Sequence, residues 1–89
     1  MSVTKLRELK VANFDGNKFK RVPEAIFLLH TLENLIVSNN ELLEFGTAVS
    51  NLRSLKTLDL QGNLKLEFLP TSLGTMTNLE VLKLARCPL

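Results

Sequence analysis

The segment Leu55–Pro70, LKTLDLQGNLKLEFLP, decides the fold of this 89-residue chain. Its leucines at 55, 58 and 60 are spaced as L-x-x-L-x-L, an asparagine follows at 63, and a leucine-proline pair closes the segment at 69 and 70. The alternation of apolar and other residues is typical of a short strand buried on one face. The proline then suits the first turn of a helical segment. We therefore expect a strand, a turn and a short return segment, in that order.

The same pattern recurs along the chain at a nearly constant offset. The leading leucines are Leu9, Leu32, Leu55 and Leu79, which gives steps of 23, 23 and 24 residues. The extra residue of the third repeat lies between Asn63 and Leu66. A fixed period in this range indicates a solenoid of stacked repeats. We expect one domain over residues 1–89, divided into a partial repeat 1–8, full repeats 9–31, 32–54 and 55–78, and a partial repeat 79–89.

Equivalent strands are predicted near residues 11–14, 34–37, 57–60 and 81–84. Each strand returns one repeat later in the same direction, so the strands must pair as a parallel sheet with one outward face. The return segments have space for only one or two helical turns, as between Pro70 and Met76. We expect little regular helix, with short 3₁₀ or irregular segments on the side opposite the sheet.

These features resemble the leucine-rich repeat family, and the resemblance covers the chain from Val3 to Leu89. The leucine-proline pair and the 23-residue period are similar to the typical class of such repeats, which is common in intracellular proteins. The segment LKTLDLQGNLKLEFLPTSLGTMTNLEVLKLARCPL also resembles repeats of plant nucleotide-binding immune receptors. The second repeat departs from both classes, because Gly46 occupies the proline position. The resemblance implies an α/β right-handed solenoid, a horseshoe segment whose parallel sheet lines the concave face.

One polar position follows each predicted strand, where the chain bends inward. Backbone groups buried there lack sheet partners, and a side-chain amide can satisfy both N–H and C=O groups. We therefore interpret this position as a structural ladder and not as a ligand site. Cysteine is small enough for the last rung but is a weak donor. The predicted ladder comprises Asn17, Asn40, Asn63 and Cys87.

Composition disfavours several classes of function. The charges, 11 Lys plus Arg against 9 Asp plus Glu, are scattered, and only Lys18, Lys20 and Arg21 form a small basic group. With no Trp, no Tyr and five Phe, the chain offers few stacking platforms, so we expect no nucleic-acid partner. A single cysteine excludes an internal disulfide, which favours a reducing compartment and a cytoplasmic location. We find neither a signal-peptide pattern nor 18 consecutive apolar residues, and we expect no membrane association.

The chain offers few groups for catalysis. His30 is its only histidine and lies more than fifty residues from Cys87, so these two residues make no zinc site. The hydroxyls of Ser38, Ser50, Ser54 and Ser72 lack a matching histidine and acid. Gly16 and Gly62 each precede a ladder asparagine and are interpreted as turn residues, not as a phosphate loop. We expect no enzyme activity, no cofactor and no metal.

The outward residues of the sheet are the predicted binding site for a protein or peptide. Their residue types vary from repeat to repeat, whereas the core positions are uniformly apolar. The family resemblance implies docking on this surface. The set comprises Val11, Asn13, Asp15, Asn34, Ile36, Ser38, Thr57, Asp59, Gln61, Val81, Lys83 and Ala85. Apolar contact would come from its valines and isoleucine, and its aspartates would accept from a basic partner.

The alternative is that the interface lies at the ends of the stack. The chain would then be a structural segment, or a fragment of a longer scaffold or immune-receptor array, that associates through its ends. Val3 and Leu6 fit the last apolar positions of a repeat, and Leu89 follows directly after the fourth strand and its turn. Terminal repeats normally carry polar caps, and neither end shows an obvious one. We expect marginal stability or self-association on this basis.

Overall fold

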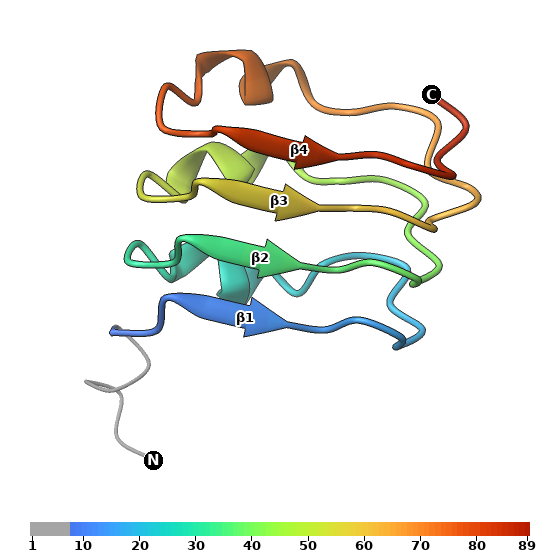
Figure 1. Ribbon diagram of the computed structural model, residues 1–89, viewed down its shortest axis with the longest axis horizontal. Helices are drawn as coiled ribbons and strands as arrows, with labels where there is room; N and C mark the ends of the chain where they lie inside the picture. Colours follow the sequence, from blue (N-terminus) through green and yellow to red (C-terminus); the bar gives the residue numbers. More distant parts are fainter. Residues whose placement is uncertain (1–7) are drawn as a thin grey trace.

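One sheet of four parallel strands organises the computed structural model, which describes residues 8–89 (Figure 1). The strands are β1 (Val11–Asn13), β2 (Asn34–Ile36), β3 (Thr57–Asp59) and β4 (Val81–Lys83), and their order across the sheet is their order in the chain. Each strand begins where the repeat pattern predicts and ends one residue earlier, which confirms the parallel sheet. The predicted apolar positions Val3 and Leu6 lie outside the described residues.

The register of the sheet aligns equivalent positions of the four repeats. Every strand is offset from its neighbour by one full turn of the chain, so the same repeat position recurs in one row across the sheet. The middle row faces the interior and is formed by Ala12, Leu35, Leu58 and Leu82. The flanking rows face outward, as the period-2 alternation requires.

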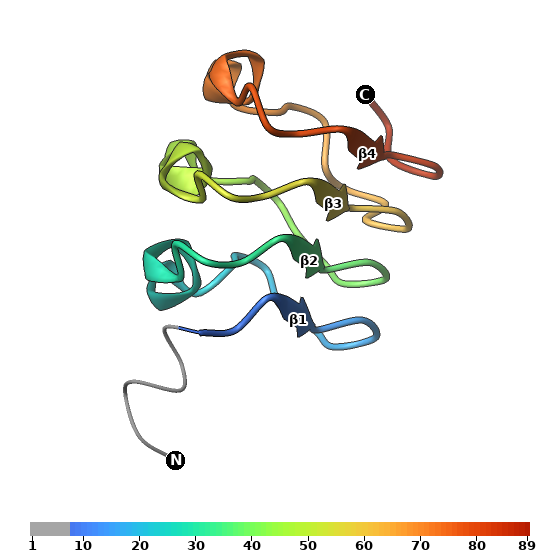
Figure 2. The ribbon, with the colours of Figure 1, turned by 60° about the vertical axis from the view of Figure 1, so that its left-hand side comes forward.

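Three short 3₁₀ segments form the side opposite the sheet (Figure 2). They are η1 (Glu24–Leu28), η2 (Thr47–Asn51) and η3 (Thr71–Thr75). Each is opened by an N–H that donates to a carbonyl three residues earlier, as in the 3.0 Å bond from Ile26 to Pro23. The prediction of little regular helix is confirmed. No helical segment within residues 8–89 has the length and apolar character needed to cross a membrane.

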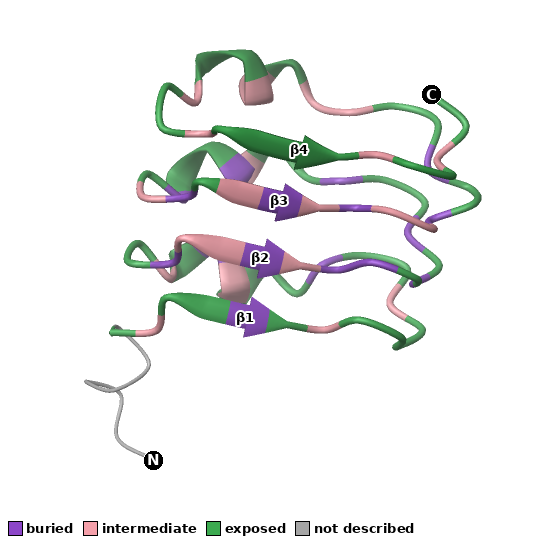
Figure 3. Ribbon diagram, viewed as in Figure 1, coloured by how far each residue is buried: buried purple, intermediate pink, exposed green. Residues whose placement is uncertain are grey.

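The core lies between the sheet and the 3₁₀ segments, and it is tightest in the two central repeats (Figure 3). Fully buried apolar side chains from these repeats fill it: Leu32, Leu35, Val37, Leu42, Val49, Leu52, Leu55, Leu58, Leu60 and Leu66. The last turn differs, because all three residues of β4 are exposed. A repeat is therefore well buried only where turns lie on both sides of it.

The asparagine after each central strand joins its own turn to the preceding one. Nδ2 of Asn63 donates to the carbonyl of Leu60 at 2.7 Å and to that of Val37, one repeat earlier, at 3.1 Å. Its Oδ1 accepts from the N–H of Leu42 at 3.2 Å, and the residue is fully buried. Asn40 makes the equivalent bonds to Val37, Phe14 and Phe19. These amides satisfy backbone groups that bend away from the sheet.

The last rung of this ladder is supported by the extra residue of the third repeat. Sγ of Cys87 lies 3.0 Å from the carbonyl of Leu60, so the thiol makes only the donor contact of an asparagine. An asparagine at position 87 would accept a hydrogen bond from the backbone N–H of Leu66. That N–H donates instead to the carbonyl of Asn63 at 3.1 Å. This bond closes a tight turn over the two residues between Asn63 and Leu66, where the sequence places the extra residue. One of these two residues, Leu64, is 71% exposed.

Phe27 is a core residue that the repeat pattern does not mark. It is 3% exposed, whereas the predicted apolar position beside it, Ile26, is only half-buried. Its ring meets that of Phe45 edge to face, with centroids 5.8 Å apart. Cε2 of Phe27 would lie 3.6 Å from a Cβ built on Gly46. The aromatic ring thus covers the place where the other repeats carry proline.

Replacing Gly46 with proline is expected to stabilise the fold. Gly46 has φ −67° and ψ 150°, close to the φ −67° and ψ 141° of Pro70 at the equivalent position. Within residues 8–89 its N–H donates no backbone hydrogen bond. Gly46→Pro should raise the free energy of unfolding by about 0.4–1 kcal/mol, because it restricts the unfolded chain. Thermal and urea unfolding measure this gain, with Gly46→Ala as the smaller matched change. A lower melting temperature for the proline variant would contradict the prediction.

Candidate functional site

The outward face of the sheet, defined by the twelve predicted residues, consists of three rows that cross all four strands. The structure exposes Val11, Asn13, Asp15, Val81, Lys83 and Ala85, and leaves Asn34, Ile36, Thr57, Asp59 and Gln61 half-buried. Ser38 is the exception, since it is 6% exposed. The prediction that Ser38 is available to a partner is therefore wrong. Its hydroxyl instead donates to Oδ1 of Asp15 at 2.6 Å, so the buried Ser38 orients an exposed residue of the face.

Asp15 is held in place by the neighbouring turn. Oδ1 accepts from Ser38 and, at 3.0 Å, from Nδ2 of Asn39. The hydrogen bond from Ser38, followed by that from Asn39, lowers the pKa of the Asp15 carboxyl below its ordinary value. The carboxylate therefore stays ionised at neutral pH. Its orientation is fixed, while the residue as a whole remains exposed.

Asp59 is arranged differently on the central strand. Its Oδ1 accepts from the backbone N–H of Gln61 at 3.1 Å, and both carboxylate oxygens accept from Nε2 of the same residue at 3.1 and 3.2 Å. Asp59 pairs in register with Lys83 on β4 and with Ile36 on β2. Along this row Ile36, Asp59 and Lys83 therefore present an apolar, an acidic and a basic side chain in succession.

Asn34 carries an unsatisfied group on this face. Its Oδ1 is buried and has no hydrogen-bond partner among the described residues. An unpaired buried acceptor costs about 1–3 kcal/mol. Its neighbours in register, Val11 and Thr57, donate no hydrogen bond to this oxygen. Because the atom is buried, the missing partner is a cost within the fold.

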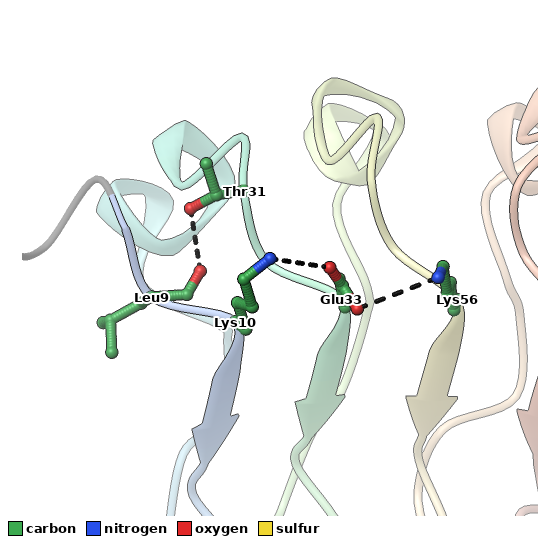
Figure 4. Close-up of polar contacts among 5 residues, drawn as sticks. All are labelled: Leu9, Lys10, Thr31, Glu33 and Lys56. Carbon is green, nitrogen blue, oxygen red and sulfur yellow. Dashed lines mark hydrogen bonds and ion pairs between the residues drawn. The ribbon is translucent and has the colours of Figure 1, made fainter.

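A row of alternating charge borders the face at the strand starts, and our sequence reasoning missed it. Nζ of Lys10 lies 3.2 Å from Oε2 of Glu33, and Nζ of Lys56 lies 3.8 Å from Oε1 (Figure 4). The same position in the last repeat is Glu80. The signal was present, because the residue after each leading leucine alternates between lysine and glutamate.

The turns at the other border share a left-handed residue. Gly16 and Gly62 both have φ +75°, and Asn39 and Arg86 occupy the equivalent positions with φ of 53° and 63°. Glycine adopts this conformation without steric cost, and asparagine tolerates it. The predicted turn role of the two glycines agrees with this geometry. Oδ1 of Asn39 also lies 3.5 Å from Nη2 of Arg86, so polar side chains extend across this border.

The outward face does not include His30 or Cys87. His30 is exposed after η1, and the half-buried Cys87 is engaged with the carbonyl of Leu60. Within residues 8–89 no three His, Cys, Asp or Glu side chains gather as a metal site would need. The chemistry that the site supports is recognition by charge, hydrogen bonds and apolar contact.

Residues 54–76 match the family model of the leucine-rich repeat. The match spans the third repeat, which carries the segment that predicts the fold, and the other three strands align with it in register. The third repeat is therefore a leucine-rich repeat. The four-stranded parallel sheet and short 3₁₀ segments of the chain form a segment of a leucine-rich repeat solenoid. Domains of this family typically bind proteins.

Acidification should weaken the leucine-rich repeat fold through Glu33. The hydrogen bond from Lys10, its charge and that of Lys56 lower the pKa of Glu33 below its ordinary value of 4.5. Its stabilising contribution is therefore complete above that ordinary value and is lost as the pH falls through the lowered one. Urea unfolding between about pH 6 and pH 3 should show a smaller loss of stability for Glu33→Gln than for the natural chain. The exposed Glu67, changed to Gln, is the matched control, and equal pH profiles for both variants would refute the assignment.

Alanine should be tolerated less at Gly62 than at Gly16, although both have the same φ. A Cβ at Gly62 would collide with Oδ1 of Asn39, whereas a Cβ at Gly16 would have no described heavy atom within 4 Å. Both variants incur the backbone cost of about 1 kcal/mol for a left-handed residue. Gly62→Ala should lose more, because the side chain that connects the turns must move. Urea unfolding of both variants measures the difference, and equal losses would show that Asn39 moves freely.

Proposed function

We propose that this chain is a non-catalytic interaction module that binds a protein or peptide through the outward face of its sheet. The match to the leucine-rich repeat family supports a protein partner in general. The residues of the face support its use as the contact surface. We include in the proposal a single domain over residues 1–89 and a cytoplasmic location, which the lone cysteine favours.

The observation that carries the proposal is the fixed carboxylate of Asp15, which accepts hydrogen bonds from Ser38 and Asn39 and lies exposed at the border of the face. A basic group of a partner would meet an acceptor that is already oriented. The exposed Val11 and the half-buried Ile36 offer apolar contact on the same face, since both lie on strands that pair in register.

A basic partner fits these groups better than an acidic one. Among the described residues, Asp15, the carboxylate on the first repeat's part of the face, accepts from the neutral side chains of Ser38 and Asn39. Glu33 is already paired with two lysines, so it offers less to a ligand. Lys83 lies at the other end of the face on β4, whereas Nη2 of Arg86 lies 3.5 Å from Oδ1 of Asn39. A peptide with a basic residue and an apolar residue would meet Asp15 and the apolar side chains of the face.

A second function, a structural segment that associates through its ends, is favoured by a separate observation. Leu82 occupies the core row yet is 37% exposed, whereas its counterparts Leu35 and Leu58 are fully buried. Leu89 is 53% exposed in the same turn. Apolar side chains of this kind are normally covered by a neighbouring turn.

Selection from a random peptide library displayed on phage tests the first function. The immobilised natural chain should retain peptides that the doubly substituted Ile36→Lys and Asp59→Lys chain no longer binds. Leu28→Lys is the matched control, because Leu28 is 68% exposed on η1, away from the sheet. Peptides that bind both chains equally would refute docking on the face.

Asn34→Val separates binding from folding in the same experiment. The substitution removes the unpaired acceptor and adds a β-branched residue to the strand, so the free energy of unfolding should rise by about 1 kcal/mol. The same change should weaken peptide binding, because the side-chain amide of Asn34, a half-buried residue of the face, is lost. A variant that is more stable and binds as before would show that Asn34 takes no part in recognition.

A further inference from the structure

A cavity of about 180 Å³ lies between η1 and η2, and all of its lining residues fall between positions 21 and 48. Figure 2 shows these two segments on the side away from the strands, so the cavity is separate from the outward face. Its apolar lining comes from Val22, Phe27, Gly46 and Ala48. Val22 and Phe27 are 7% and 3% exposed, so the cavity reaches the edge of the core.

The cavity adjoins the position where the second repeat has lost its proline. Gly46 has φ −67° and ψ 150°, and Pro70 at the same repeat position has φ −67° and ψ 141°. A Cβ built on Gly46 would lie 3.6 Å from Cε2 of Phe27, which is ordinary van der Waals contact. The chain thus keeps the backbone of a proline position without the ring. The space beside Phe27 suits an apolar group of about the size of that ring.

The rim of the cavity carries more negative than positive charge. Two carboxylates, those of Glu24 and Glu44, line it against one guanidinium, that of Arg21. Nε of Arg21 lies 3.2 Å from Oε1 of Glu44, and both side chains are largely exposed. A carboxylate can accept several hydrogen bonds, so Glu44 can hold a second cation besides Arg21. The rim therefore favours a cationic group beside the apolar one.

We propose that this cavity is a second binding site, beyond the docking surface proposed above, for an extended peptide segment in which a proline precedes a lysine or arginine. The proline ring contacts Phe27 and Gly46, and its basic neighbour meets Glu24 and Glu44 at the rim. Proline segments are extended before they bind, so they lose little conformational entropy on docking. Grooves lined by aromatic side chains are a common docking place for such segments.

An acidic peptide fits the same cavity poorly. Its carboxylate would lie beside Glu24 and Glu44, and like charges in contact are unfavourable. The one cation of the rim, Arg21, is already paired with Glu44.

Nuclear magnetic resonance with a minimal probe tests the site. When the ¹⁵N-labelled natural chain is titrated with acetyl-Pro-Lys-amide, the backbone amide signals of Phe27, Thr47 and Ala48 should shift in a saturable way. The Kd should be about 1–10 mM, because a two-residue probe buries little surface. The matched probes are acetyl-Gly-Lys-amide, which lacks the ring, and acetyl-Pro-Glu-amide, which lacks the cation. Loss of the ring contact should weaken binding about tenfold.

Substitution of Gly46 tests the place of binding. Gly46→Pro fills the cavity from the chain's own backbone and should weaken binding of acetyl-Pro-Lys-amide about tenfold or more. Gly46→Ala adds one carbon, keeps the N–H and should lose less. Because Gly46→Pro is also expected to stabilise the fold, unfolding cannot account for its loss of binding. Thermal unfolding of each variant checks this.

Substitution of the rim charges tests the cation. Glu24→Gln and Glu44→Gln should each weaken binding of the probe by about two- to fivefold, the range of exposed ion pairs. Arg21→Gln should strengthen it by a similar factor, because a competing cation is removed. Glu80→Gln, at an exposed position directly before β4, makes the same change of charge away from the cavity and should leave binding unchanged.

Three results would overturn the inference. If Gly46→Pro binds the probe as the natural chain does, the ligand does not enter the cavity. If acetyl-Gly-Lys-amide binds as well as the proline probe, the contact is one of charge alone. If the signals of Thr47 and Ala48 shift with protein concentration in the absence of probe, and Gly46→Pro removes that shift, a second copy occupies the cavity and not a peptide ligand. The doubly substituted Ile36→Lys and Asp59→Lys chain should bind the probe unchanged, so failure of this inference leaves docking on the outward face unaffected.

Discussion

The buried amide of Asn63 is the interaction on which the rest of the structure depends. It satisfies carbonyls of two successive turns and one amide between them, so the chain can bend inward without leaving backbone groups unpaired. The leucines around it can then pack without strain. Because each rung needs the turn before it, the stability of a repeat lies largely in its contact with its neighbours.

The same dependence explains why the ends differ from the centre. Asn40 and Asn63 are buried, whereas Asn17 is exposed and, among the described residues, its side chain bonds only within its own turn. At the other end Cys87 makes the donor contact of the rung, and the tight turn after Asn63 supplies the bond that the thiol does not. The outward face is thus supported on a core that is complete in its two middle repeats.

The strands and return segments could be predicted from the sequence because the repeat is regular. Four leading leucines in steps of 23, 23 and 24 residues fix the register before any contact is known. Phe27 could not be found in this way, because its burial depends on the ring of Phe45 in the next repeat and on the space above Gly46. A pattern within one repeat carries no information about such cross-repeat packing.

The sequence by itself determined which residues belong to the outward face, since alternation along a strand fixes the side on which each side chain emerges. Only the tertiary structure decided how those residues are used. It buries Ser38 beneath Asp15, pairs Glu33 with two lysines and leaves Oδ1 of Asn34 without a partner among the described residues. The physical reason is distance in the chain: these contacts join residues about one repeat apart, and side-chain hydrogen bonds form only after the turns have stacked.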